Sequence, residues 1–540
     1  MAVMNSDLDT GAPSKILVLG LDMGDGPLIQ EWVKQGKLPN FADAMLNGSW
    51  WELESPAAML HTSTWPTFAT GVQPGCHGVY YPFQPRPGYQ QAQHVDSDQY
   101  GAPTFWALAD QRDRRCIVYD LPETFLEQGF KGRAVFEWGT WARYGQRLSQ
   151  PKSLIDDLKS RFGPYPLKLE ATRLGLKFPN PAKLERRLIK SIEHKVESLK
   201  WLLGQDDWDL AVVGLCETHP TGHYLWPADY RADSESDSSR LAAVQNVYTA
   251  VDKALGTIRH SLPADTIIMI ASGDGVRPNH CGWHLLPEVM EKLGYAVPPA
   301  QIPAVASKPL SLKAIKTAVP PGARRWIADH LPYWLREKIN ARVDSGGLDW
   351  SKTKAFTLPT DLEGYIRINL AGREPEGIVE PGAEYESLCR EIAARLEKLV
   401  NPTTGRPAVN KVEIRDEIFP GSAREHLPDL IVSWNGDAPI SMISSPEIGT
   451  IEQRSPDPRT GTHSPAAFLL ATGPGIQIGG RSVGRLVDVA PTVLALLGVE
   501  LASAMDGEPL ARVTAGAGEG VSVAGEGEVR SANVKTEEDR

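Results

Sequence analysis

The sequence predicts an α/β protein in which helices sandwich a mostly parallel sheet, with a smaller lobe inserted late in the chain. Three observations lead to this prediction. Short aliphatic runs recur along the chain, helical patterns separate several of them, and a proline-rich stretch near residue 300 interrupts the alternation. Strands that alternate with helices usually form a parallel sheet covered on both faces. The 540 residues, 41% of them hydrophobic, are enough for one large core.

The expected strands are continuous aliphatic runs, as in strands that are buried on both faces. The first run, in 15–22, ends at a glycine-rich turn. Similar runs follow at 210–215, 266–272, 430–434 and 467–472.

Helices are expected where apolar residues recur with helical spacing. Such patterns cover 184–203 and 239–260, which precede the second and third runs, and 487–498 near the end. The carboxyl ends of parallel strands meet at one edge of a sheet, and ligands bind there. We therefore expect Asp22, the segment after residue 215 and the segment after residue 271 to lie close together.

The domain organisation follows from changes in composition. Residues 15–299 and 426–513 are expected to form the core, and 300–425, which hold Pro320-Pro321 and only short strand-like pieces, the inserted lobe. The ends, 1–14 and 514–540, are polar and poor in apolar residues, so we expect them to be disordered.

Charge and cysteine content narrow the class of protein. The formal net charge of −11 argues against a nucleic-acid polymer or an anionic membrane as partner, since both attract positive surfaces. Five cysteines without a Cys-x-x-Cys pair indicate neither a disulfide framework nor a thiolate zinc site. The first residues lack the pattern of a secretion signal, and no long apolar run follows. We expect a cytoplasmic protein.

Candidate metal ligands lie at the ends of the expected strands. Asp22 follows the first, His219 and His223 follow the second with the spacing of one helical turn, and Asp274 follows the third. His463 comes much later in the chain. Imidazoles on one face of a helix, with carboxylates at neighbouring strand ends, are a usual arrangement for a divalent cation.

The order of several motifs resembles the alkaline phosphatase superfamily, in its type I phosphodiesterase and nucleotide pyrophosphatase branch. The motifs are LGLDMGDG after residue 18, STWPTFATGVQPGCHG with Thr70-Gly71 and His77-Gly78, and TGTHSPAAFLLATGPGI with His463. The resemblance covers roughly residues 15–510. It implies a phosphohydrolase with two metal ions, in which a Thr or Ser at the start of a helix attacks phosphorus.

The resemblance assigns metal ligands, with two departures from the family pattern. Asp22, His223 and His463 match family ligands, whereas His219 stands where the family has Asp, and Gly273-Asp274 replace its Asp-His. Three histidines, His219, His223 and His463, then form one site suited to zinc. Asp22 and Asp274, with His61, are left for a second ion, which is Mg²⁺, Mn²⁺, Ca²⁺ or zinc, or for an empty site.

The nucleophile has three candidates. The family spacing counted back from Gly71 leads to His61, whereas the local Thr-x-Pro pattern selects Thr64, and Thr62 lies beside the counted position. We prefer Thr64, because Pro66 suits the first turn of a helix. His61 then serves as a ligand or base.

The segment after Gly364 resembles one that lies beside the pocket in related enzymes, so Arg367 and Arg373 are expected to contact a substrate anion.

The function expected from these residues is metal-dependent hydrolysis of phosphate esters, of the phosphodiesterase or pyrophosphatase kind, by in-line attack of a Thr hydroxyl. The substrate is expected to be a small phosphate ester or nucleotide-like molecule. Two alternatives stay open: a repurposed member that binds a ligand without catalysis, and a related sulfate-ester hydrolase or phosphoryl transferase. Thr64, in place of a cysteine, argues against a formylglycine sulfatase.

Overall fold

The computed structural model describes residues 15–85, 92–94, 100–139, 148–167, 180–227, 235–299, 347–358, 360 and 362–514. The ends expected to be disordered, 1–14 and 515–540, lie outside these residues, as does most of the proline-rich start of the lobe, 300–346. Residue 514, which we assigned to the tail, ends the helix α17 (Ala511–Thr514).

The expected α/β fold is confirmed: a large sheet forms the centre of the core. Its order is β21-β2-β20-β9-β1-β8-β5-β6-β7. The five strands from β9 to β6 run parallel, and β20 and β7 join them antiparallel. The strands are β1 (Lys15–Leu21), β2 (Gly48–Glu54), β5 (Cys116–Tyr119), β6 (Arg133–Phe136), β7 (Leu148–Gln150), β8 (Leu210–Leu215), β9 (Thr266–Ser272), β20 (Ala467–Thr472) and β21 (Arg481–Arg485).

Helices cover both faces of this sheet, as the continuous aliphatic runs predict. Alternate residues of β1 face opposite sides, so that Leu17 and Leu19 pack in one apolar cluster and Ile16 and Val18 in another. The first cluster joins the sheet to α1 (Gly26–Lys34), α2 (Pro39–Leu46), α6 (Leu154–Phe162), α7 (Pro181–Leu203) and α9 (Glu235–His260). The second joins it to α3 (Thr64–Thr70), α5 (Phe105–Gln111), α16 (Val489–Leu496) and α17.

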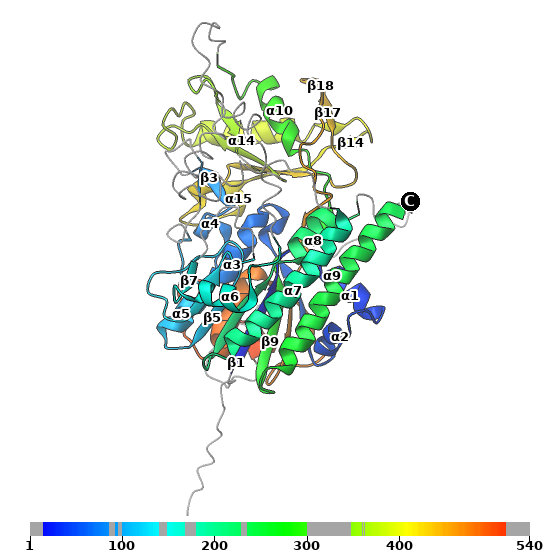
Figure 1. The fold of residues 1–540 in the computed structure, drawn as a ribbon. Coiled ribbons are helices and arrows are strands. Elements are labelled where there is room, and N and C mark those ends of the chain that lie inside the picture. Colours follow the sequence, from blue (N-terminus) through cyan, green and yellow to red (C-terminus); the bar gives the residue numbers. More distant parts are fainter. Residues whose placement is uncertain are drawn as a thin grey trace, which may run out of the picture.

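The smaller lobe lies at one end of the core and has its own sheets (Figure 1). One is the antiparallel sheet β11 (Ala355–Thr357), β12 (Gly364–Ile368), β16 (Leu430–Trp434) and β15 (Val409–Ile414), in that order. The other has the order β14 (Arg406–Pro407), β13 (Val400–Asn401), β17 (Met442–Ser445) and β18 (Gly449–Glu452). The helices α10 (Leu286–Lys292), α14 (Ala383–Leu396) and α15 (Arg415–Ile418) belong to this part of the chain.

The boundaries of the lobe differ from the expected 300–425. The run 430–434, which we expected in the main sheet, pairs with β12 and β15 instead. Residues 281–296 and 440–451, which we assigned to the core, pack in the apolar cluster of the lobe. An aliphatic run shows that a strand is buried, but the lobe has a core of its own that buries β16 equally well.

None of the helices in the described part of the chain has the length and apolar character needed to cross a membrane.

Candidate active site

A pocket lies at the carboxyl ends of the central strands, where the sequence predicts it. β1 ends one residue before Asp22, β8 ends at Leu215 shortly before α8 (Thr218–Leu225), and β9 ends two residues before Asp274. The pocket and the open space at its mouth together measure about 610 Å³. It is lined by Asp22, His61, Thr62, Thr64, Trp65, Tyr81, Pro82, Pro122, Glu123, His219, His223, Asp274, Arg459 and His463.

One glycine allows His463 to lie close to α8. His463 lies in the short strand β19 (Gly461–Ser464), which pairs with β10 (Gly275–Pro278). A Cβ atom on Gly461 would lie 2.1 Å from the carbonyl oxygen of Gly222 in α8, closer than any real contact. Glycine at position 461 therefore allows the strand to approach the helix that carries His219 and His223.

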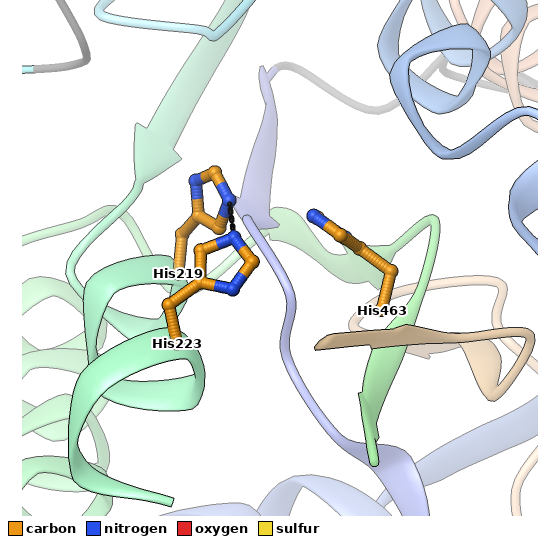
Figure 2. Close-up of side chains that lie close together, drawn as sticks. All are labelled: His219, His223 and His463. Atoms are coloured by element: carbon orange, nitrogen blue, oxygen red, sulfur yellow. Dashed lines mark hydrogen bonds between the residues drawn. The ribbon is translucent and has the colours of Figure 1, made fainter. Parts of the chain in front are cut away.

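The three histidines turn ring nitrogens toward one another (Figure 2). The Nε2 atoms of His219 and His223 lie 2.9 Å apart. One ligand atom from each of His219, His223 and His463 falls within 4.8 Å of the other two. Side chains from a helix and from a strand more than two hundred residues later thus meet in one place.

An oxygen lies near the other nitrogen of each ring, in a hydrogen bond for His223 and His463 and in an ion-pair contact for His219. His223 Nδ1 lies 2.9 Å from the carbonyl oxygen of Gly461, and His219 Nδ1 lies 2.9 Å from Asp22 Oδ2. His463 Nδ1 pairs with Asp274 Oδ2. The carbonyl oxygen of Gly461 can only accept, so the proton of His223 lies on Nδ1 and its Nε2 offers a lone pair to the pocket.

This arrangement fits a divalent cation. The Nε2 atoms of His219 and His223 lie 2.9 Å apart, so either a proton on one of them or a cation bound by both must stand between their lone pairs. Burial lowers the pKa of His223 and of His463 well below its usual value. Both rings are therefore neutral, the form that binds metal.

The pKa values of the two carboxyl groups of the site, Asp22 and Asp274, are shifted in opposite directions. Burial alone would raise the pKa of Asp22, but His219, Trp65 and His463 outweigh it and lower that pKa. Burial, together with the charge of Asp22, raises the pKa of Asp274 to about 8. Trp65 Nε1 donates to Asp22 Oδ1 at 2.9 Å, and the backbone N–H of Met23 donates to Asp274 Oδ1 at 3.0 Å.

The three candidate nucleophiles all reach the pocket. His61 and Thr62 lie in a 3₁₀ turn (His61–Ser63), and Thr64 begins α3. The Thr64 hydroxyl donates to the carbonyl oxygen of His61 at 2.9 Å. His61 stacks on His463, with ring centroids 4.5 Å apart.

Three charged groups at the site were not predicted from the sequence. Arg459 and Glu123 line the pocket, and Glu363 Oε2 lies 2.8 Å from His61 Nδ1. Proximity in sequence was the available signal. Arg459 lies just before β19, the strand that contains His463, and Glu363 lies just before the Gly364 segment, which was already expected beside the pocket. An arginine or a glutamate in these segments does not by itself indicate a contact with the pocket.

The arginines proposed to contact substrate lie elsewhere. Arg367 is fully buried, and its Nε donates to Glu374 Oε1 at 2.5 Å. Arg373 pairs with Asp429 at 2.6 Å. Neither lines the pocket, so the structure does not support Arg367 or Arg373 as a substrate-binding residue. Acidic partners within the lobe hold both side chains inside it.

Solved structures of three other proteins are similar to this chain over most of its length. Among solved structures, murine ectonucleotide pyrophosphatase/phosphodiesterase 5 is 14% identical, with 92% of this chain and 97% of that chain covered and a TM-score of 0.46. Its human counterpart is 12% identical, with 93% and 99% covered and a TM-score of 0.47. Phosphonoacetate hydrolase from Sinorhizobium meliloti 1021 is 12% identical, with 90% and 96% covered and a TM-score of 0.47. A comparison with curated proteins finds no match.

A family profile gives the assignment. The profile described as type I phosphodiesterase / nucleotide pyrophosphatase matches residues 16–441, most of the 540-residue chain. The match includes Asp22, the candidate nucleophiles, the two histidines of α8 and Asp274. The chain therefore belongs to the type I phosphodiesterase/nucleotide pyrophosphatase family.

Proposed function

We propose that this protein is a metal-dependent hydrolase of phosphate diesters. The observation that carries the proposal is the convergence of His219, His223 and His463 beside Thr64 in one pocket. The family profile supports hydrolysis of phosphate esters. Zinc is the cation that three neutral imidazoles suit best.

Thr64 is the proposed nucleophile. Its hydroxyl oxygen attacks phosphorus, an O–P bond to Thr64 forms, and the bond to the leaving alkoxide breaks on the opposite side, so that the Thr64 proton ends on the leaving group as an alcohol. Water then cleaves the Thr64 ester, restores the Thr64 hydroxyl and releases the phosphate monoester. A divalent cation held by the three histidines would supply positive charge for the phosphoryl oxygens.

Residues of this chain orient the reactants. Trp65 fixes Asp22, and Asp22 in turn faces His219, so the residue next to the nucleophile also positions a ligand. Arg459 adds a positive charge at the pocket wall. Its guanidinium is held by Asp457 through bonds of 2.9 Å from Nε and 2.6 Å from Nη2. We propose that Arg459 binds the anionic part of the substrate that does not react.

The test combines metal analysis with two model substrates. We expect purified protein to contain bound zinc and to hydrolyse bis-p-nitrophenyl phosphate faster than p-nitrophenyl phosphate. His223→Ala should lose both the metal and the activity. The matched control is His260→Ala, which removes a histidine at the far end of α9, where its Nδ1 lies 2.6 Å from the carbonyl oxygen of Gly256.

Each outcome separates the proposal from its alternatives. Metal binding without hydrolysis of either ester would favour a repurposed ligand-binding member. Faster cleavage of p-nitrophenyl sulfate would favour a sulfate-ester hydrolase. Activity that survives His223→Ala would reject the metal-dependent mechanism.

A further inference from the structure

We propose that Glu217 is a positioning residue for the site: its side chain fixes the start of α8, the helix that carries His219 and His223. The proposal rests on the proposed function, in which these two histidines bind the metal ion. Glu217 itself does not line the pocket. The placement of the two histidines would then depend on a buried group of side chains that touches neither substrate nor ion.

The helix α8 has little in its own sequence to fix its position. It has eight residues, fewer than an isolated helix needs for stability in water, and Gly222 in its interior weakens it further. Glu217 occupies the N-cap position, but its side chain makes no capping hydrogen bond to the helix. Contacts with neighbouring elements therefore decide where α8 lies.

The two ends of α8 are held by different contacts. Near its carboxyl end, the backbone N–H of Thr460 donates to the carbonyl oxygen of His223 at 2.9 Å. At its start, Thr218 Oγ1 donates to the carbonyl oxygen of Asp22 at 2.6 Å. The side chain of Glu217 is the second anchor at the start, and its partners lie outside the helix.

Three groups converge on one oxygen of Glu217. Ser191 Oγ, on α7, donates to Glu217 Oε1 at 3.1 Å, and the hydroxyl of Tyr165 donates to the same oxygen. Lys195 Nζ, one helical turn further along α7, lies 3.8 Å from it. Only 1% of Glu217 is exposed, so water does not compete for these contacts. They tie the start of α8 to the long helix α7.

Lys195 allows Glu217 to carry a charge in this buried place. The lysine is fully buried, its Nζ lies 2.8 Å from Asp120 Oδ2, and it donates to the carbonyl oxygen of Gly214 in β8 at 2.8 Å. Burial would lower the pKa of Lys195, but Asp120 and Glu217 outweigh burial and hold that pKa well above its usual value. Displacing one member of such a group leaves an unpaired buried charge, so few arrangements are tolerated. The group thus fixes α7, β8 and the start of α8 relative to one another.

The first test compares zinc affinities. The metal-free full-length protein and its variants are titrated with Zn²⁺ in competition with a chromophoric chelator. We expect Glu217→Ala to bind zinc about 10–100-fold more weakly, the usual cost of losing a group that orients metal ligands. Glu217→Gln should recover most of this affinity, because its amide oxygen can replace Oε1, and Oε2 has no hydrogen-bond partner within the described residues.

A milder pair of variants keeps every charge in place. Ser191→Ala removes one hydrogen bond to Glu217. Ser198→Ala is the matched control, because Ser198 is also a fully buried serine on α7, but its hydroxyl lies 2.7 Å from that of Tyr119. Zinc affinity should fall in Ser191→Ala, by less than in Glu217→Ala, and should stay unchanged in Ser198→Ala.

The geometry of the site provides a second measurement. The visible spectrum of the Co²⁺-loaded protein reports how the ligands are arranged around the ion. The absorption bands should shift in Glu217→Ala and stay in place in Ser198→Ala. Circular dichroism of the metal-free proteins establishes that each variant is folded at the temperature of the titration.

Different results would overturn different claims. A folded Glu217→Ala protein with unchanged zinc affinity and an unchanged Co²⁺ spectrum would overturn the positioning role. If Glu217→Ala does not fold, equal zinc affinities of Ser191→Ala and Ser198→Ala would overturn it instead. Unmodified protein that binds no Zn²⁺ and hydrolyses no ester would overturn the proposed function itself.

Discussion

Gly273 lies directly behind Thr64: a Cβ atom at position 273 would stand 2.8 Å from Thr64 Cβ and 3.4 Å from Thr64 Cγ2. Position 273 follows the last residue of β9, and Thr64 begins α3. The end of a sheet strand thus sets the place of the proposed nucleophile. The absence of a side chain at 273 lets α3 approach the strand.

Gly273→Ala should slow the reaction without removing the metal. The added methyl group must displace Thr64, and a shift of about 1 Å in a reacting group can cost about 100-fold in rate. We expect kcat for bis-p-nitrophenyl phosphate to fall by that order while zinc content stays unchanged. Gly436→Ala is the control, because a Cβ there meets nothing nearer than 3.9 Å. Equal activity of Gly273→Ala and the control would argue against Thr64 as the attacking group.

Thr64→Ala should abolish covalent turnover, whereas Thr62→Ala should not. Removal of a catalytic nucleophile typically lowers kcat by about 10³-fold or more. Rapid quenching followed by mass spectrometry should find a phosphoryl adduct on Thr64 in the unmodified protein and none in Thr64→Ala. An adduct that persists in Thr64→Ala but vanishes in Thr62→Ala or His61→Ala would move the nucleophile to that residue.

Arg459→Lys should weaken substrate binding more than it slows the chemical step. Lysine keeps the positive charge but loses the planar pair of donors that Arg459 uses on Asp457. A hydrogen bond to a charged group contributes about 1.5–3 kcal/mol, so KM for a diester should rise roughly 10- to 100-fold with kcat less affected. Arg454→Lys is the control, since Arg454 is exposed on the same segment. An unchanged KM in Arg459→Lys would remove Arg459 from the substrate site.

Metal removal should destabilise the folded protein. An ion that binds only the folded state adds RT ln(1 + [L]/Kd), or about 2.7 kcal/mol at a free concentration of 100 times Kd. We therefore expect the melting temperature to fall on treatment with a chelator and to recover with Zn²⁺. The His463→Ala protein should show no zinc-dependent shift. A shift of normal size in that variant would place the ion elsewhere in the chain.

The fold could be predicted from sequence because the central strands are unambiguous. The runs of β1, β8 and β9 are aliphatic throughout and fall in the parallel centre of the sheet. The run of β16 is just as aliphatic, but it pairs in the smaller lobe, and composition alone does not say which neighbours bury a strand.

The site was predicted in part for a similar reason. Asp22 and His219 could be grouped because both follow central strands. Arg367 was assigned to substrate because its buried partner, Glu374, cannot be recognised from spacing. Arg459 lines the pocket and Glu363 contacts His61, and both belong to segments outside the central strands, whose path the periodicity does not reveal.

Acid should destabilise the smaller lobe through Asp429. Burial would raise the pKa of Asp429, but the guanidinium groups of Arg373, Arg415 and Arg367 outweigh burial and hold that pKa well below its usual range. A carboxyl with a lowered folded pKa contributes its full stability above the unfolded pKa of about 3.9 and loses it as the pH falls further. The contribution of Asp429 should therefore be constant near neutral pH and decline below about pH 4.

Urea unfolding of the unmodified protein and of Asp429→Asn, followed from about pH 7 down to about pH 3, measures this decline. Near neutral pH the variant should be less stable by about 3–5 kcal/mol, because two buried arginines lose their carboxylate. The difference between the two proteins should shrink as the pH falls below about 4, since the unmodified protein then loses the same charge. Asp437→Asn, which breaks an exposed ion pair with Arg406, should follow the unmodified protein at every pH. A difference that stays constant down to the lowest pH would show that the Asp429 charge does not stabilise the lobe.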